Sequence, residues 1–363
     1  MTTGLLLGLL AAGPAGHALA AESPVTLRMQ ASWPTTLTVY ENFLYFAERV
    51  DKLSGGRLMI ETLPVNSVVG SFDVLEAVGD GRLDGGHTWA GYWQSRHKAG
   101  VLFTGGPGGP FGMDHLDHLG WLFDGGGIEL YRRYYSEVLG IPVVPLPILP
   151  AGPQAFGWFE RPVRSLDDLK NMRCRETGIA AQIFSEMGMS VMALPGGDIA
   201  SAAERGIIEC GEWSGGADDL RLGFQDIWKY YYTPGVHESV SVGELLVNEA
   251  VWDGLAPDLR EIVQSASMET FLRWWVRAQK LNAEALDRMV EEDGVIVVRT
   301  PDEFLLEILR TWDELAEREA AADPFFKEVL ESKRAYARVV VPAKRFGTAP
   351  YSLAADHYWP RER

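Results

Sequence analysis

The sequence contains few of the features that mark metal-cluster, nucleic-acid-binding and membrane proteins. Only 2 of the 363 residues are cysteines, which excludes CxxC-type metal clusters. The net charge is -17 and no basic cluster occurs, so a nucleic-acid or anionic-membrane partner is not expected. No apolar run approaches the roughly 18–20 residues of a membrane span. The patterns G-x-S-x-G and H-E-x-x-H are also missing, and nothing else points to catalysis.

What is present is the composition of a large packed α/β chain. Hydrophobic residues make up 47% of it, and 363 residues exceed one comfortable core, which favours two lobes. Strand patterns alternate with helix patterns, as in βαβ units. We expect a strand at residues 25–34, then a helix that Thr38 begins and Glu41 completes as a capping box. A buried strand at residues 240–248 should re-enter the first lobe, and residues 257–294 have continuous helical spacing.

The first twenty residues have the pattern of a secretory signal peptide. They contain no charged residue, a short apolar core from Leu5 to Ala12, and an A-x-A cleavage site at Ala18 to Ala20. The expected location is therefore the periplasm.

One short pattern occurs twice, in "AVGDGRLDGGHTW" and in the segment leading to "RGIIECGEW". The two copies keep one offset of 125 residues, as from Gly81 to Gly206, and they align His87 with Glu212. Each copy has the form of a helix end, a glycine turn and a short buried strand, followed by a polar and an aromatic residue. Since ligands of open α/β sheets bind beyond the carboxyl ends of strands, both polar ends are predicted to face a cleft between two lobes.

The two cysteines, Cys174 and Cys210, fall on predicted strands near this cleft. An oxidising periplasm permits a disulfide, but a bridge requires Cα atoms within about 7 Å. We favour two buried free thiols.

The charged residues of the predicted cleft are suited to holding an anion. Arg175 has a planar fork that can grip a carboxylate through two hydrogen bonds, although pairing with Glu176 or Asp198 at the surface is the simpler alternative. Glu212 would repel such an anion unless a cation lay between them. Glu212, Gln154 and the Trp213 carbonyl are oxygen donors for a hard cation, Na⁺ or Ca²⁺. Ca²⁺ usually recruits more oxygens, and Glu238 is the candidate for supplying one.

From about residue 25 to residue 326 the sequence resembles the DctP-type periplasmic solute-binding proteins of tripartite ATP-independent periplasmic (TRAP) transporters. The resemblance is closest to the metal-dependent branch that binds α-keto acids or lactate. It rests on "RMQASWP", "VVGSFDVLEAVGDGRLDGGH", "QAFGWF", "MRCRETG", "GGDI", "RGIIECGEW", "DDLRLGF" and "YYYTPG". It implies a two-lobed, type II-like α/β binding protein with its ligand cleft between the lobes, crossed more than once by the chain, and a membrane permease as partner.

The resemblance also implies roles for particular residues. The spacing to "GGDI" makes Arg175, and not Arg173, the residue that binds the substrate carboxylate. Gln154, Glu212 and the Trp213 carbonyl correspond to the ion ligands, and Tyr92 to a tyrosine that approaches the substrate oxygen. After "YYYTPG" the family's aromatics are replaced here by Val236 and His237, which implies a changed pocket wall.

The expected organisation has four parts: a signal peptide at residues 1–20, lobe 1 at 21–148 with a return segment at about 238–275, lobe 2 at 149–237 with about 276–330, and a tail at 331–363. The tail is a candidate contact of a homodimer, although Pro342 and Pro350 interrupt it where relatives have a long helix. Two alternative functions stay open. One is a ligand-sensing module with the same pocket, and the other is an exported enzyme with Glu212 and His87 as acid and base.

Overall fold

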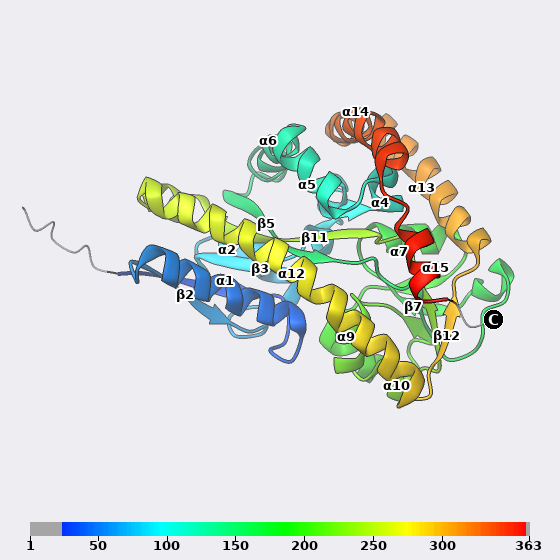
Figure 1. Ribbon diagram of the computed structural model, residues 1–363. Helices are drawn as coiled ribbons and strands as arrows, with labels where there is room; N and C mark the ends of the chain where they lie inside the picture. Colours follow the sequence, from blue (N-terminus) through cyan, green and yellow to red (C-terminus); the bar gives the residue numbers. More distant parts are fainter. Residues whose placement is uncertain (1–23, 361–363) are drawn as a thin grey trace, which may run out of the picture.

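The computed structural model describes residues 24–360 and divides them between two sheets flanked by helices (Figure 1). The expected signal peptide lies outside the described residues. The first sheet has the order β2-β1-β3-β11-β4, with β5 also paired to β11, and we call its unit lobe 1. Its strands are β1 (Val25–Ala31), β2 (Leu58–Leu63), β3 (Gly85–Thr88), β4 (Gly105–Gly106), β5 (Val143–Ala151) and β11 (Val240–Asn248).

The second sheet, which defines lobe 2, has the order β12-β10-β6-β9-β7-β8. Its strands are β6 (Gly157–Phe159), β7 (Arg173–Arg175), β8 (Ser190–Met192), β9 (Cys210–Gly211), β10 (Tyr230–Thr233) and β12 (Ile296–Arg299). In both lobes the expected βαβ units are confirmed. Helix α1 (Thr38–Ser54) joins the parallel strands β1 and β2, and α7 (Gly178–Glu186) joins the parallel strands β7 and β8.

The repeated pattern is confirmed as two equivalent segments, each a short helix, a turn and a short strand. Each copy begins with a short helix, α2 (Val74–Gly79) or α8 (Ile199–Glu204). In lobe 1 the amide of Asp84 donates to the Arg28 carbonyl, and the Arg28 amide donates back to the Asp84 carboxylate. In lobe 2 Glu209 and Arg173 exchange the same two bonds. The same pair of hydrogen bonds thus precedes β3 beside β1 in lobe 1 and β9 beside β7 in lobe 2, and both pairs of strands are parallel.

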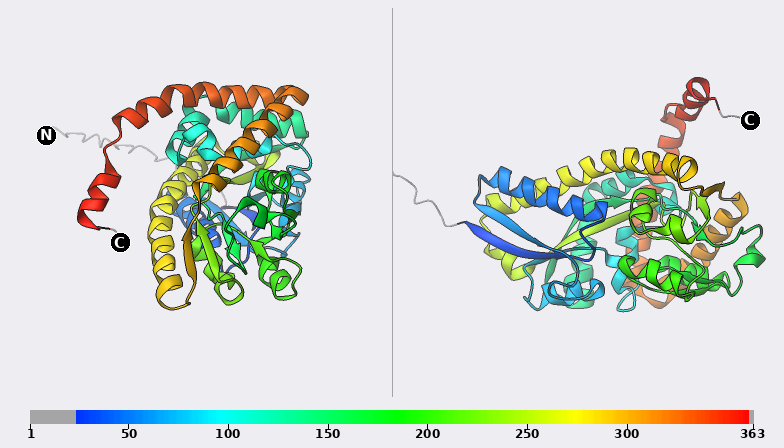
Figure 2. Two further views of the ribbon diagram at one scale, coloured as in Figure 1. Left: turned by 90° about the vertical axis from the view of Figure 1, so that its right-hand side faces the viewer. Right: turned by 90° about the horizontal axis from the view of Figure 1, so that it is seen from below.

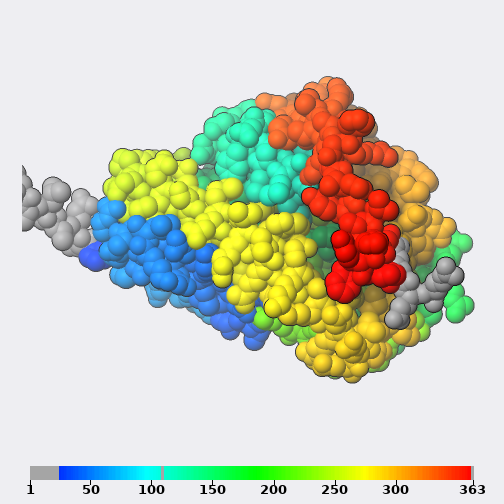
Figure 3. Space-filling model, in the orientation of Figure 1, coloured from blue at the N-terminus to red at the C-terminus, as the bar shows by residue number. Residues whose placement is uncertain are grey.

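The chain crosses between the sheets after β5, again after β10, and a third time along α12 (Pro257–Glu291). The return through β11 is confirmed, because all of that strand is buried and it pairs with β3. At 35 residues α12 is about 52 Å long, so it reaches from α1 and β5 in lobe 1 to β12 in lobe 2. Figure 3 shows it lying along one face of the molecule. The exact lobe boundaries stay a prediction.

The expected capping box at the start of α1 is wrong. Thr38 is the first residue of the helix, the N-cap is Leu37, and no side chain of the helix itself caps this end. The Thr38 hydroxyl binds Asp218 of α9 (Gly216–Arg221) instead. A contact from the other lobe therefore replaces the local cap that the sequence spacing favoured.

The C-terminal segment covers both lobes before it leaves the body. Helix α13 (Asp302–Ala322) packs on α7, and α14 (Pro324–Gly347) returns to α5 (His115–Asp124) and α6 (Gly127–Arg133) of lobe 1. Pro342 lies inside α14 without ending it. Helix α15 (Tyr351–Tyr358) has no buried residue and stands away from the body (Figure 2).

The remaining α-helices of the described chain are short connections. They are α3 (Gly100–Thr104), α4 (Gly108–Gly112), α10 (Phe224–Ile227) and α11 (Glu249–Gly254). Within residues 24–360, no helix has the length and apolar character that crossing a membrane requires.

The preference for free thiols is also wrong, because Cys174 and Cys210 form a disulfide. The two residues are direct partners on the parallel strands β7 and β9, and their Cα atoms are 4.6 Å apart. Strand order decides this proximity, and a separation of 36 residues in the sequence does not reveal it.

Removing this disulfide should destabilise the protein. Replacing both Cys174 and Cys210 by alanine removes the closed loop from the unfolded chain, so we expect the free energy of unfolding to fall by about 4 kcal/mol. Chemical denaturation measures the change, and wild-type protein under reducing conditions is the control that should match the variant. Equal unfolding midpoints for variant and oxidised wild type would contradict the expectation.

Candidate functional site

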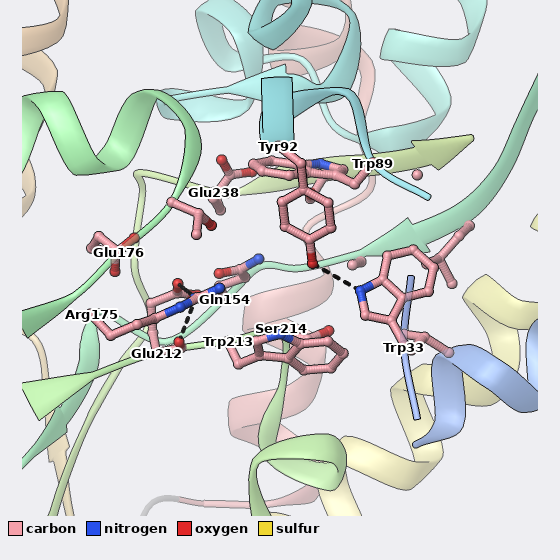
Figure 4. A pocket seen from close by; sticks show the side chains of 16 residues that line it. Trp33, Trp89, Tyr92, Gln154, Arg175, Glu176, Glu212, Trp213, Ser214 and Glu238 are labelled. Atoms are coloured by element: carbon pink, nitrogen blue, oxygen red, sulfur yellow. Dashed lines mark hydrogen bonds and ion pairs between the residues drawn. The ribbon is translucent and has the colours of Figure 1, made fainter. Parts of the chain in front are cut away.

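A cavity between the two lobes brings together all six residues predicted for the site. It encloses about 490 Å³, including the part open to solvent. The predicted residues that line it are Tyr92, Gln154, Arg175, Glu212, Trp213 and Glu238. Trp33, Trp89 and Glu176 line it as well. Figure 4 shows the charged groups gathered toward one end, with Trp33 and Tyr92 toward the other.

Strand ends place the central ion pair of this cavity. Arg175 is the last residue of β7, and Glu212 follows β9 directly, where Arg175 and Gly211 are register partners. Arg175 Nη1 lies 2.6 Å from Glu212 Oε1 and 2.7 Å from the Glu212 carbonyl oxygen. Arg175 Nε donates to the Leu194 carbonyl at 3.0 Å. The guanidinium is thus fixed before any ligand arrives, and the alternative of a surface arginine is wrong because Arg175 is 1% exposed.

The two crossing segments between the lobes place Gln154 and Glu238. Gln154 lies between β5 and β6, and Glu238 between β10 and β11. The Gln154 amide donates to the Glu238 carbonyl at 3.1 Å, and the Gly235 amide donates to the Gln154 carbonyl at 2.8 Å. These bonds between the crossing segments hold both side chains at the cavity.

Three buried oxygens of this group have no hydrogen-bond partner within residues 24–360. They are Gln154 Oε1, Glu212 Oε2 and Glu238 Oε2. A buried oxygen without a donor costs free energy, so a ligand that supplies positive charge is favoured at this place. One amide and two carboxylate oxygens are the donors that Na⁺ and Ca²⁺ prefer, and the residues present therefore fit a hard cation. The role of the Trp213 carbonyl stays a prediction.

Sequence reasoning gave no ligand role to two further groups that lie near Glu212. Glu176 and His237, both buried, each offer a ligand atom, and these atoms and one from Glu212 all lie within 4.8 Å of one another. Neither ring nitrogen of His237 has a hydrogen-bond partner in the described chain. Glu176 could have been found, since it follows Arg175 at the carboxyl end of a strand. His237 was expected to alter the pocket wall, but neither it nor Val236 lines the cavity.

The acidic side chains are protonated more readily than usual. Burial raises the pKa of Glu238 well above its ordinary value, and the negative charge of Glu212 raises it further. Burial also raises the pKa of Glu176 well above its usual range, and the negative charge of Glu212 again adds to the effect. Both carboxyl groups therefore keep their protons to a higher pH than an exposed carboxyl group does.

Tyr92 is poised as a hydrogen-bond donor to a ligand. Its hydroxyl oxygen accepts from Trp33 Nε1 at 2.9 Å (Figure 4), which leaves its own proton free to be donated. Burial raises the pKa of the Tyr92 phenol, so that proton is retained at neutral pH.

His87 is not part of the site, and the proposed acid and base pair of Glu212 and His87 is wrong. The His87 ring is fully buried in lobe 1, stacked on Phe43 and 2.8 Å from Asn42 Oδ1. Burial lowers its pKa to about 3. Trp89, two residues later, reaches the cavity that His87 was expected to reach.

Comparison with known proteins gives consistent matches over nearly the whole chain. Residues 29–320 match the model of the family described as bacterial extracellular solute-binding protein, family 7. A monocarboxylate 2-oxoacid-binding periplasmic protein from Nostoc sp. is 31% identical over 332 residues, which cover 92% of this chain and 89% of the relative.

Two solved structures have the same fold and carry ligands. A TRAP transporter solute-binding protein from Bordetella bronchiseptica superposes with a TM-score of 0.86 at 27% identity, covering 93% of this chain and 97% of its own. That structure is a mixed-occupancy dimer, in which one active site holds copurified calcium and picolinate and the other is apo. A TRAP periplasmic solute-binding protein from Pseudoalteromonas atlantica, with bound sodium and pyruvate, has a TM-score of 0.85 at 26% identity and covers 91% and 99%.

Cation binding at this cavity should strengthen as the pH rises. Because the pKa values of Glu176 and Glu238 are raised, an incoming cation must displace protons, and fewer protons are held at higher pH. We expect the affinity for Ca²⁺, measured by calorimetry without carboxylate, to keep increasing with pH above the ordinary titration range of a glutamate, with proton release on binding. The variant Glu176→Gln should flatten the dependence. Affinity that is independent of pH in the wild type would contradict this view.

Proposed function

This chain belongs to family 7 of the bacterial extracellular solute-binding proteins, and we propose that it captures a small organic carboxylate together with a bridging Na⁺ or Ca²⁺ ion. The ligand class is a 2-oxo or 2-hydroxy acid. One observation carries this proposal: a fixed arginine and three unpartnered buried oxygens face one cavity between two lobes. The relatives that bind pyruvate with sodium, or picolinate with calcium, support it.

The charges around the cavity explain why an anion and a cation would bind together. Arg175 alone carries positive charge among the lining side chains, while Glu176, Glu212 and Glu238 are acidic. A carboxylate entering alone would meet these acids in a poorly solvated space. A cation held by Gln154, Glu212 and Glu238 would neutralise the acids and leave Arg175 to bind the carboxylate.

The remaining walls select the shape of the acid. Tyr92 would donate to the oxygen beside the carboxylate, which is a carbonyl in 2-oxo acids and a hydroxyl in 2-hydroxy acids. Trp33, Trp89 and Trp213 would contact the rest of the molecule. A short apolar side chain suits these aromatic surfaces, whereas a second carboxylate would find no second cationic side chain among the lining residues.

The biological role that follows is delivery of this acid to a TRAP membrane permease. The family is extracellular, and export to the periplasm through the signal peptide at residues 1–20 agrees with it. The oligomeric form we propose is a homodimer formed through the exposed arm of α14 and α15, since the Bordetella bronchiseptica relative is a dimer.

Replacing Arg175 tests the carboxylate contact. Arg175→Ala should weaken pyruvate binding in the presence of Ca²⁺ by about 3 kcal/mol, because a desolvated charge-assisted contact is lost. Arg175→Lys should restore little, since a lysine cannot hold Leu194, Glu212 and a ligand at once. Arg173→Ala is the control, because the Arg173 side chain is 52% exposed. Calorimetric titration giving the larger loss for Arg173 would reverse the assignment.

Removing the cation tests the bridge. Chelator-treated protein in sodium-free buffer should lose at least about a hundredfold in pyruvate affinity, because the acids of the cavity then repel the ligand. Adding back Na⁺ or Ca²⁺ separately identifies the ion. Glu212→Gln should weaken retention of that ion, while Glu209→Gln, the neighbouring acid that pairs with Arg173, should not. Unchanged affinity after removal of both ions would refute the bridge.

A further inference from the structure

A buried carboxylate of lobe 2, Asp218, binds Thr38 in the first turn of helix α1 in lobe 1. Asp218 Oδ1 accepts from the Thr38 amide at 2.6 Å, and Asp218 Oδ2 accepts from the Thr38 hydroxyl at 2.6 Å. Thr38 is 5% exposed and Asp218 4% exposed. Figure 1 shows α9, which carries Asp218, beside this end of α1 and under α12. Both carboxylate oxygens are thus used in a contact between lobes.

The contact satisfies groups that neither lobe satisfies alone. The first amides of a helix have no partner within the helix, and the N-cap Leu37 provides no side-chain acceptor. The positive end of the α1 dipole also favours a carboxylate at this position. Separating Thr38 from Asp218 would lose both bonds to water, so the contact stabilises the arrangement of the lobes described here.

A second, more exposed set of charges surrounds this contact. Arg221, three residues after Asp218, pairs with Glu41 at 2.7 Å and donates to the Thr36 carbonyl at 3.1 Å. Arg277 of α12 holds the other oxygen of Glu41 at 2.6 Å. These side chains are about one third exposed or more, so their contribution is smaller than that of the buried pair.

The contact lies close to the ligand cavity on both sides. Val39 follows Thr38 and lines the cavity, and Ser214, four residues before Asp218, lines it as well. A movement that opens the cavity between these two residues would therefore pull Thr38 and Asp218 apart.

We propose that Thr38 and Asp218 form a clasp that holds the lobes closed over the bound solute and sets how slowly the solute leaves. Neither residue touches the ligand cavity, so both act by positioning the lobes. The clasp rests on the proposed solute-binding function for its role, but its effect on lobe closure does not require a ligand.

Dissociation kinetics test the clasp with a matched pair of variants. Thr38→Val keeps the size of the side chain and removes the hydroxyl, so the dissociation rate of pyruvate with Ca²⁺ should rise about tenfold or more, with little change in association rate. Thr38→Ser keeps the hydroxyl and should retain slow dissociation. Asp218→Ala should raise the dissociation rate more than Thr38→Val does, because it removes both acceptor oxygens. Asp258→Asn, an exposed acid in the first turn of α12, is the control. Stopped-flow tryptophan fluorescence measures the rates.

A second measurement needs no ligand. Spin labels at Asp73 and Asp198, exposed residues of opposite lobes that line one surface pocket, report the separation of the lobes. Thr38→Val and Asp218→Ala should shift the ligand-free distances to longer values, and Thr38→Ser should not. If wild-type protein binds no 2-oxo or 2-hydroxy acid, the proposed function fails while these distances still decide the clasp. Unchanged distances in both variants, or dissociation as slow as in the wild type, would overturn it.

Discussion

The buried ion pair of Arg175 and Glu212 is the interaction on which the site depends. Two charged side chains, 1% and 4% exposed, are taken out of water at the ends of adjacent strands. Burying ions is costly unless the geometry is good and the remaining polar atoms are satisfied. Arg175 meets this condition through two backbone carbonyls and Glu212, but Glu212 keeps one oxygen without a partner. The protein thus retains an unsatisfied negative site that a ligand can complete.

The crossing segments also carry buried oxygens that lack a hydrogen-bond partner in the described chain. Gln154 and Glu238 each direct an unpartnered oxygen toward a space already rich in acid, and the bonds between their backbones hold them there. A core would not tolerate such a group of oxygens for stability alone. The arrangement is intelligible as a binding site in which a cation and an anion complete each other. Closure of the lobes over such ligands would exclude water and so strengthen each of these interactions.

Long helices connect the two lobes to each other. Helix α12 reaches from one lobe to the other, and α13 and α14 carry the chain from α7 back to α5 and α6. We expect these elements to limit movement between the lobes to a hinge. The cavity and the contact of Thr38 with Asp218 lie where the two lobes meet. The relation between the lobes is thus decided by contacts that no single lobe contains.

The sequence by itself determined the α/β units, the repeated helix-turn-strand segments, the buried strand β11, the long helix α12 and six residues of the cavity. These follow from local periodicity, turn residues and the rule that strand ends face a cleft, helped by resemblance to a family. Only the tertiary structure decided that Cys174 bonds to Cys210, that Thr38 is held by Asp218, that His87 lies in the core, and that Glu176 and His237 adjoin Glu212. Each of these depends on which strands are neighbours or how two lobes meet. Spacing along the chain carries no information about such distances, because they are created by packing between segments far apart in sequence.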